Sequence, residues 1–229
     1  MERFTRLELL IGEKLATIQE KTVLIIGLGG VGGHAVEALA RLGIGHLILV
    51  DPDRVALSNL NRQVIATEET LGILKTEAFQ KRIHSINPSC RVDLKTMFVT
   101  ASNVASLFDA PIDYVIDACD TVEAKKALLR YCTTHQIKLI SSMGMGNRLD
   151  PTQIEIIDIR KTAYDPLAKI MRKMVREERL KGKIPVVWSR EQPLHQTGKT
   201  IGSNALVPSV AGLLCANYIF QDIIKEDPA

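Results

Sequence analysis

Short apolar runs alternate with amphipathic stretches through the first part of the chain. Thr22–Ile26 is apolar, rich in β-formers and followed by glycines, and His46–Val50 repeats this pattern after a stretch with helical spacing. We therefore predict a unit of strand, helix and strand. Further strands are predicted over 92–98, 114–118 and 137–141, with helical spacing between them.

This alternation determines the fold class that we expect. Strands that alternate with helices form a mostly parallel sheet with helices on both faces, so we predict a Rossmann-like α/β fold. The less regular C-terminal half is expected to continue the same domain. We thus predict one domain over residues 1–229, with a nucleotide-binding core over about 1–145 and a substrate-facing part over about 146–229.

The second half has weaker periodicity but clear local signals. Asp150 and Pro151 indicate a turn, 154–159 indicates a strand, and 166–180 indicates a polar helix. The segment 172–190 carries seven Lys and Arg residues against two Glu residues. Such a surplus suits a surface that follows RNA phosphates, and it is equally typical of a solvated helix face.

Composition and charge narrow the function classes. The 229 residues are 46% hydrophobic and 24% charged, as in ordinary soluble proteins, and the net charge of +3 is too small to bind nucleic acid by itself. The late apolar stretch 205–220 is interrupted by Pro208 and Gly212, so we expect no membrane span and a cytoplasmic protein. The four cysteines form no CxxC pair, which argues against a zinc site and favours buried thiols.

A glycine motif follows the first predicted strand. Gly27, Gly29, Gly30 and Gly32 match GxGxxG between a strand and a helix, and Asp51 ends the next strand. Glycines let the backbone approach a phosphate, the helix N-terminus offers free N–H groups, and an acid such as Asp51 can bind ribose hydroxyls. On these residues alone NAD is the default ligand, and a purely structural glycine turn is the alternative.

The residues after Asp51 favour a triphosphate instead. Arg62 lies in the segment Ser58-Asn59-Leu-Asn61-Arg62-Gln63, and Lys75 follows on a predicted helix. A planar guanidinium and a mobile ammonium together suit a triphosphate whose pyrophosphate must leave. Asp120 follows the strand predicted over 114–118, at the edge where open α/β sheets bind ligands, and a carboxylate there can hold Mg²⁺.

Taken together, these motifs resemble a known family. GLGGVG, VDPDRVALSNLNRQ, Lys75 and DACDT are similar, in order and spacing, to the adenylating fold shared by ThiF, MoeB and the ubiquitin-activating enzymes. The resemblance implies ATP and Mg²⁺ as cofactors, with Mg²⁺ on Asp120. It implies the cofactor contacts Gly27, Gly29, Gly30, Gly32, Asp51, Asn59, Asn61, Arg62 and Lys75.

The same resemblance implies a homodimer. Arg3-Phe-Thr-Arg6 is similar to the family's RxxR segment, whose second arginine reaches into the ATP site of the partner subunit. The catalytic set that the resemblance implies is therefore Arg6, Arg62, Lys75 and Asp120. We expect composite sites in which Arg6 serves the neighbouring subunit.

The second half resembles one branch of that family. Segments beginning at Ser142, Arg148, Asp158, Asp165 and Trp188 are similar to the tRNA threonylcarbamoyladenosine dehydratases, the TcdA branch. This implies ATP-dependent cyclisation of threonylcarbamoyladenosine in the anticodon loop of tRNA, by adenylation of its carboxylate. Because ring closure is intramolecular, no enzyme nucleophile is needed, which agrees with the absence of cysteine between residues 160 and 204.

Three other readings remain open. An adenylyltransferase for a ubiquitin-like sulfur carrier has the same fold, but the chain lacks the zinc CxxC pairs of MoeB and ThiF. An NAD-dependent oxidoreductase agrees with Asp51 and not with Arg62, Lys75 or Asp120. A non-enzymatic RNA-binding module would use the basic segment 172–190. A sulfur-transfer protein is a further possible partner, and the histidines show no metal-ligand spacing.

Overall fold

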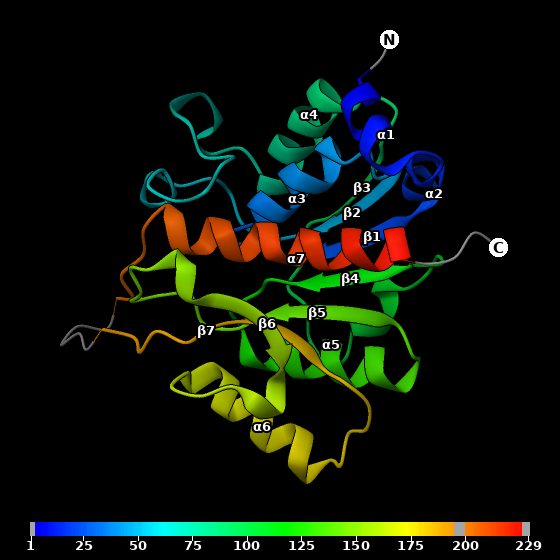
Figure 1. Ribbon diagram of the computed structural model, residues 1–229. Helices are drawn as coiled ribbons and strands as arrows, with labels where there is room; N and C mark the ends of the chain where they lie inside the picture. Colours follow the sequence, from blue (N-terminus) through cyan, green and yellow to red (C-terminus); the bar gives the residue numbers. More distant parts are fainter. Residues whose placement is uncertain (1–2, 195–199, 226–229) are drawn as a thin grey trace.

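One sheet organises the computed structural model, which describes residues 3–194 and 200–225. Its strand order is β3-β2-β1-β4-β5-β7-β6 (Figure 1). All neighbouring pairs are parallel except β6 and β7, which are antiparallel. The strands are β1 (Thr22–Ile26), β2 (His46–Val50), β3 (Arg91–Lys95), β4 (Tyr114–Asp117), β5 (Lys138–Ser142), β6 (Ile154–Asp158) and β7 (Pro185–Ser189).

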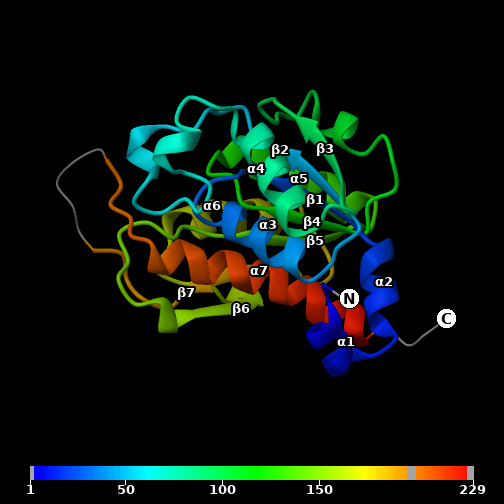
Figure 2. The same ribbon diagram turned by 90° about the horizontal axis from the view of Figure 1, so that it is seen from above.

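Helices cover both faces of this sheet, as expected (Figures 1 and 2). Because successive side chains of a strand point to opposite faces, Val23 and Ile25 of β1 join one apolar core, while Leu24 and Ile26 join the other. The first core contains α2, α3, α4 and α7, and the second contains α5 and α6. The helices are α1 (Thr5–Ile11), α2 (Lys14–Glu20), α3 (Gly32–Arg41), α4 (Lys75–Ile86), α5 (Val122–Thr134), α6 (Pro166–Glu177) and α7 (Leu206–Lys225).

The long helix α7 is a core helix of this sheet. Within the described residues it is the one helix long and apolar enough to cross a membrane. However, Ala211, Cys215 and Ile219 are fully buried. A Cβ added at Gly212 would lie 2.1 Å from the carbonyl oxygen of Val31, so α7 packs very closely on the start of α3. This burial agrees with the expectation that the apolar stretch does not span a membrane.

The predicted α/β class is confirmed, and the differences are local. The strand predicted over 92–98 ends at Lys95, because the N–H of Met97 bonds back to the Lys95 carbonyl and turns the chain. The helix predicted over 166–180 ends at Glu177, before the positive φ of Arg179. The sequence pattern did not predict β7, a short strand that lies between β5 and β6 and pairs with both.

Candidate nucleotide site and its surroundings

The glycine loop, residues 27–32, joins β1 to α3 at the middle of the sheet. Gly27 has a φ of 88°, and a Cβ there would lie 2.7 Å from the carbonyl oxygen of Ala118. A Cβ at Gly32 would lie 1.8 Å from the carbonyl oxygen of Gly27. Only glycine therefore allows this turn. The connections after β1 and β4 diverge here, which is the place where open α/β sheets bind ligands.

The other two glycines differ in the space around them: Gly29 is open, whereas Gly30 is closely packed. A Cβ at Gly29 would find no heavy atom nearer than the Nε2 of Gln63, at 3.7 Å. A Cβ at Gly30 would lie 3.0 Å from Pro208 and 3.4 Å from the carbonyl oxygen of Arg62. The glycine loop thus lies between the Arg62 segment and the start of α7, with an approach for a ligand above Gly29.

Asp51 and Lys75 meet directly beside this loop. Asp51 is 4% exposed, and its carboxylate accepts hydrogen bonds from the N–H groups of Leu28 at 2.6 Å and Asp53 at 2.8 Å. Lys75, the first residue of α4, is 5% exposed. Its Nζ donates to Oδ2 of Asp53 at 2.9 Å and lies 3.7 Å from Oδ1 of Asp51. A buried ammonium thus lies beside the Asp51 carboxylate, which itself bonds to Leu28 of the glycine loop.

The segment 56–63 forms the next wall, and the side chains of Asn59, Asn61 and Arg62 are bonded within the chain. Oδ1 of Asn59 accepts the N–H of Ala56 at 3.0 Å, and Nδ2 of Asn61 donates to the carbonyl oxygen of Ser203 at 3.0 Å. The guanidinium of Arg62 donates to the carbonyl oxygen of Ser58 and to Oδ1 of Asn61. The structure therefore brings Asn59, Asn61 and Arg62 to this wall, and the Cγ of Arg62 would lie 3.6 Å from a Cβ at Gly30.

Asp120 stands on the loop that follows β4. Its carboxylate is exposed and accepts a hydrogen bond from the Thr121 hydroxyl at 3.4 Å. Residues 3–194 and 200–225 contain no group of three His, Cys, Asp or Glu side chains that could hold a metal ion alone. A single carboxylate fits Mg²⁺ nonetheless, because protein-bound Mg²⁺ keeps waters and takes its other ligands from substrate phosphates.

We call the switch point beside the glycine loop, next to Asp51, Lys75 and Asp120, the crevice, and Arg6 lies away from it. It is exposed on α1, and neighbouring Phe4 packs near Gly43 while Arg3 donates to the carbonyl oxygen of Ile86. Gly43 follows α3 and Ile86 ends α4, so both lie at the opposite ends of these helices from Gly32 and Lys75 (Figure 1). The length of α3, about 15 Å at 1.5 Å per residue, thus separates the α1 region from the glycine loop.

Two groups in this region were not predicted from the sequence. Lys125 of α5 is fully buried, and its Nζ lies 3.1 Å from Oδ2 of Asp117, beside the Ser141 hydroxyl. Burial lowers the pKa of Lys125, but the Asp117 carboxylate outweighs it and holds this pKa above the ordinary value. Gln63 is 7% exposed, and its Oε1 accepts no hydrogen bond within the described chain. The acidic end of β4 and the charged Lys inside the apolar stripe of α5 were the available signals.

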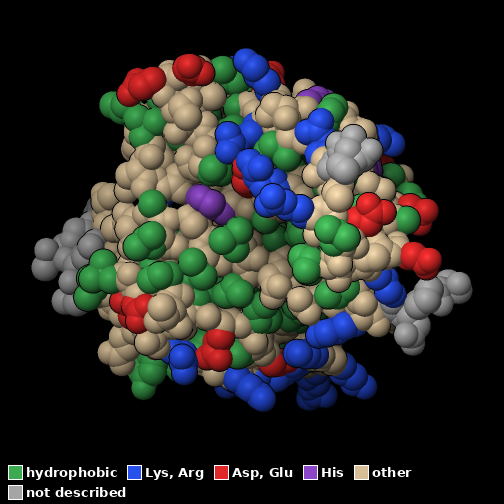
Figure 3. Space-filling view, turned by 45° about the horizontal axis from the view of Figure 1, so that its top comes forward, with side chains coloured by type: hydrophobic (Ala, Val, Ile, Leu, Met, Phe, Trp, Pro, Cys, Tyr) green, Lys and Arg blue, Asp and Glu red, His purple; other side chains and the backbone are tan. Residues whose placement is uncertain are grey.

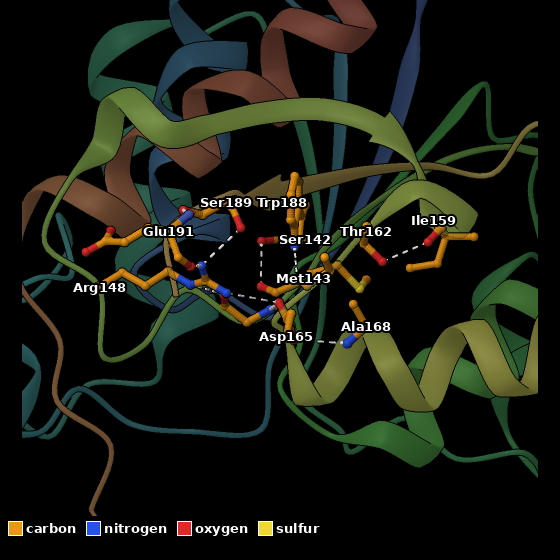
Figure 4. Close-up of polar contacts among 12 residues, drawn as sticks. Ser142, Met143, Arg148, Ile159, Thr162, Asp165, Ala168, Trp188, Ser189 and Glu191 are labelled. Carbon is orange, nitrogen blue, oxygen red and sulfur yellow. Dashed lines mark hydrogen bonds and ion pairs between the residues drawn. The ribbon is translucent and has the colours of Figure 1, made fainter. Parts of the chain in front are cut away.

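Segments of the second half meet around one buried arginine, as Figure 4 shows. Arg148 is 2% exposed, and its guanidinium donates to the carbonyl oxygens of Gly144, Ser189 and Glu191. It lies 3.5 Å from Oδ2 of Asp165. Burial lowers the pKa of Arg148, while its acidic neighbours act to raise it. We call these residues the Arg148 cluster.

The Arg148 cluster fixes the start of α6. Asp165 accepts the N–H of Ala168 at 3.0 Å as the N-cap of α6, and its other oxygen accepts the N–H of Gly144 at 2.9 Å. Trp188 is 6% exposed, and its Nε1 donates to the carbonyl oxygen of Ala163 at 2.8 Å. Trp188 therefore anchors a loop within the core, and its burial leaves little surface for stacking on a base.

The outer side of α6 carries a basic groove. Its volume is about 860 Å³. Figure 3 shows Lys and Arg side chains gathered along the lower edge of the molecule, on the side where Figure 1 places α6. Three of the cations have local partners, since Arg160 lies 3.0 Å from Asp158, Arg172 donates to Thr162, and Lys173 lies 3.7 Å from Glu177. The lining residues are Arg160, Pro166, Lys169, Ile170, Arg172, Lys173, Val175 and Arg176.

The four cysteines are poor nucleophiles. All four are free thiols, and Cys119 lies nearest to the crevice. Burial raises the pKa of Cys90 to about 11 and those of Cys132 and Cys215 to about 12. Burial and the nearby Asp117 carboxylate also raise the pKa of Cys119. Since the thiolate is the reactive form, the site offers no activated cysteine.

Comparison with known proteins agrees with this geometry. The model of the ThiF family matches residues 2–229. The chain is 42% identical to the tRNA threonylcarbamoyladenosine dehydratase of Bacillus subtilis, over 99% of this chain and 96% of that protein. It is 42% identical to the Escherichia coli enzyme of the same name, over 94% and 79%. The crystal structure of E. coli TcdA in complex with ATP superposes with a TM-score of 0.91 at 36% identity, covering 97% and 93%.

Proposed function

The chain belongs to the ThiF family, and on that premise we propose that it catalyses the ATP-dependent dehydration of threonylcarbamoyladenosine in tRNA to the cyclic hydantoin. One observation carries this proposal. Both halves of the chain match the tRNA threonylcarbamoyladenosine dehydratases, and the structural match to the ATP complex of E. coli TcdA covers 97% of the residues. The nucleotide is therefore ATP, which corrects the NAD that the glycine motif alone favours.

The first step is adenylation of a carboxylate. The threonine carboxylate of the modified base attacks the α-phosphorus of ATP, the bond to the β-phosphate breaks, and an acyl-adenylate and pyrophosphate form. In our proposal the glycine loop cradles the phosphates and Asp51 holds the ribose. Lys75 and Arg62 stabilise the charge that develops on the phosphates, because fixed cations in a crevice stabilise a charged transition state without reorganisation.

Asp120 would hold Mg²⁺ in this proposal. Its exposed carboxylate stands on the loop that touches the glycine loop, and the phosphates of ATP would complete the coordination. When bound, Mg²⁺ neutralises phosphate charge and favours loss of pyrophosphate.

The second step closes the ring without a protein nucleophile. A nitrogen of the carbamoyladenosine group attacks the activated carbonyl carbon, loses its proton, and expels AMP. Because nucleophile and electrophile belong to one side chain, proximity supplies much of the rate. The raised pKa values of the thiols, Cys119 included, agree with a reaction that uses no cysteine.

For the partner RNA we propose the basic groove as the binding surface. Lys169, Arg172 and Arg176 line it from one helix, and this helix begins at the Arg148 cluster. Arginine and lysine contacts to phosphate give RNA affinity without reading sequence. The reaction is then cytoplasmic, where tRNA is found, and a sulfur-transfer protein stays a possible additional partner.

We further propose that the enzyme is a homodimer with composite sites. Arg6 lies far from its own crevice, and on the same helix Leu9 and Leu10 are each 82% exposed, which suits a covered interface. Arg6→Ala and Lys75→Ala should each abolish turnover. An equal mixture should recover about a quarter of the wild-type rate, because half of the dimers are mixed and each holds one intact site. If the mixture recovers no activity, Arg6 acts in the ATP site of its own subunit.

The function itself is tested on products. The pure protein is incubated with Mg·ATP and tRNA that carries threonylcarbamoyladenosine. The tRNA is then digested, and the masses of its nucleosides are measured by mass spectrometry. Loss of one water from that nucleoside, matched by AMP release, is the expected result. An unchanged nucleoside, with ATP bound, would contradict the proposal and favour adenylation of a protein carrier. Thermal stabilisation by NAD and not by ATP would favour an oxidoreductase.

A further inference from the structure

A buried ion pair supports the floor of the crevice. Asp117 ends β4 at 1% exposure, Lys125 comes from the first turns of α5 at 0%, and Ser141 is the register partner of Asp117 on β5 at 5%. The ammonium of Lys125 lies 3.1 Å from Oδ2 of Asp117. It also donates to the Ser141 hydroxyl at 3.2 Å and to the Asp117 carbonyl at 3.4 Å. Ser141 in turn donates to Oδ2 of Asp117 at 2.6 Å.

The second carboxylate oxygen of Asp117 is directed at the loop of residues 118–121. It accepts the backbone N–H of Cys119 at 3.3 Å and the thiol of Cys119 at 3.0 Å. The carboxylate thus connects Lys125 and Ser141 on one side to this loop on the other. Asp120 is the next residue of the loop.

The 118–121 loop is also in close contact with the glycine loop. The N–H of Ala118 donates to the carbonyl oxygen of Ile26 at 2.8 Å. The carbonyl oxygen of Ala118 lies 2.7 Å from the position of a Cβ at Gly27, and the Cβ of Ala118 lies 3.2 Å from the position of a Cβ at Gly32. A shift of Asp117 would therefore move Asp120 and the glycine loop relative to each other.

We propose that Lys125 is a positioning residue for the adenylation step: acting through Asp117, it holds the loop that carries Asp120 in register with the glycine loop. This role rests on the proposed function, because it concerns the ATP and Mg²⁺ that Asp120 would bind. Burial of an ion pair gives little net stability against an apolar replacement, so stability alone does not account for this arrangement. The pair instead fixes geometry at a place where a misplacement of one ångström can cost about 100-fold in rate.

The test compares Lys125→Met with Lys126→Met, the same change one residue further along α5, where the side chain is paired at the surface with Glu123. Lys125→Met should lower kcat for AMP formation by about 10- to 100-fold. It should also weaken Mg²⁺-dependent ATP binding, measured by calorimetry, while metal-free ATP binding changes by less than about threefold. Lys126→Met should match the wild type in both measurements.

Two further variants keep the test decisive if Lys125→Met does not fold. Asp117→Asn combined with Lys125→Met removes both charges, and Ser141→Ala removes one donor to Oδ2 and leaves the ion pair. Both variants should lose kcat and Mg²⁺-dependent ATP binding, and the loss should be smaller for Ser141→Ala. Ser141→Thr, which keeps a hydroxyl, should restore both. Folded variants with wild-type kcat and wild-type Mg·ATP binding would overturn the positioning role. A wild-type protein that binds Mg·ATP but forms no AMP contradicts the proposed function instead, and the binding data still decide the role of Lys125.

Discussion

The two sides of the crevice are built in different ways. On the nucleotide side the shape comes from one short motif, since the glycine loop closes on Gly27 and Gly32 and is bonded to Asp51 through Leu28. In the C-terminal half, which we propose to be the substrate side, Arg148 bonds to Ser189, 41 residues away along the chain. A local motif can specify a phosphate loop, whereas the second region needs a buried charge to hold distant segments together.

The largest effect is expected from Lys75→Ala on the nucleotide side. Loss of the buried ammonium should lower the rate of AMP formation by about 100- to 1,000-fold, because the phosphates lose a fixed cation. The control is Lys81→Ala, an exposed lysine on the same helix. Initial rates of AMP release measure both variants, and circular dichroism checks that they fold. Near-normal turnover by Lys75→Ala would contradict the proposed role.

On the substrate side, Arg148→Met should lower the stability of the folded protein. It leaves the buried Asp165 carboxylate without its cation, which should lower the free energy of unfolding by about 3–5 kcal/mol. The matched variant Arg82→Met removes a partner of Glu37, and the Arg82 side chain is 38% exposed. It should lower the free energy of unfolding by about 1 kcal/mol. Urea denaturation measures both. Equal losses would show that the cluster is no more than a surface ion pair.

A smaller effect, on tRNA binding, is expected from Arg176→Glu in the basic groove. Affinity should fall, and the slope of log K against log salt should flatten by about one phosphate contact, because a cation that releases counterions is gone. Arg179→Glu is the matched control, since this exposed residue lies just past α6 and does not line the groove. Equal effects of the two changes would indicate general electrostatics and not a binding groove.

The smallest effect is a pH dependence at Asp158. Burial would raise its pKa, but the N–H groups of Arg160 and Ile184 and the Arg160 guanidinium outweigh burial, so the pKa lies below the ordinary 3.8. The resulting stability is present above the pKa of the unfolded carboxyl and is lost as the pH falls through the lower pKa of the folded protein. Asp158→Asn should therefore reduce stability by about 1 kcal/mol at pH 7 and show weaker dependence on acid. Parallel denaturation curves in acid would contradict this.

Much of the nucleotide side could be predicted from the sequence, because its signals are local. The glycine motif and β1 follow directly from residues 22–32, and the structure brings Asp51 and Lys75 to them. The assignment of ATP contacts to individual side chains remains a prediction, as does the division of the chain at about residue 145. The role of Lys125 could not be predicted from the sequence, because its partners Asp117 and Ser141 lie on two strands.

The substrate side could be predicted only in outline. Its segments resembled one branch of the family, but their convergence on Arg148 depends on pairing between β5 and β7, and β7 has no alternating pattern that separates it from a buried loop. The helix that carries part of the basic segment was predicted correctly, but the sequence did not decide whether this segment binds RNA or faces solvent. Here the tertiary contacts decide, and no single stretch of chain contains them.

The most direct test of the account follows an oxygen atom. Both carboxylate oxygens of the threonine group in the tRNA substrate are labelled with heavy oxygen. After one turnover with Mg·ATP, the masses of AMP and of the nucleoside are measured by mass spectrometry. Adenylation of the carboxylate predicts AMP that carries one heavy oxygen and a cyclic nucleoside that retains one. Unlabelled AMP beside a cyclised nucleoside would contradict the acyl-adenylate and with it the proposed mechanism.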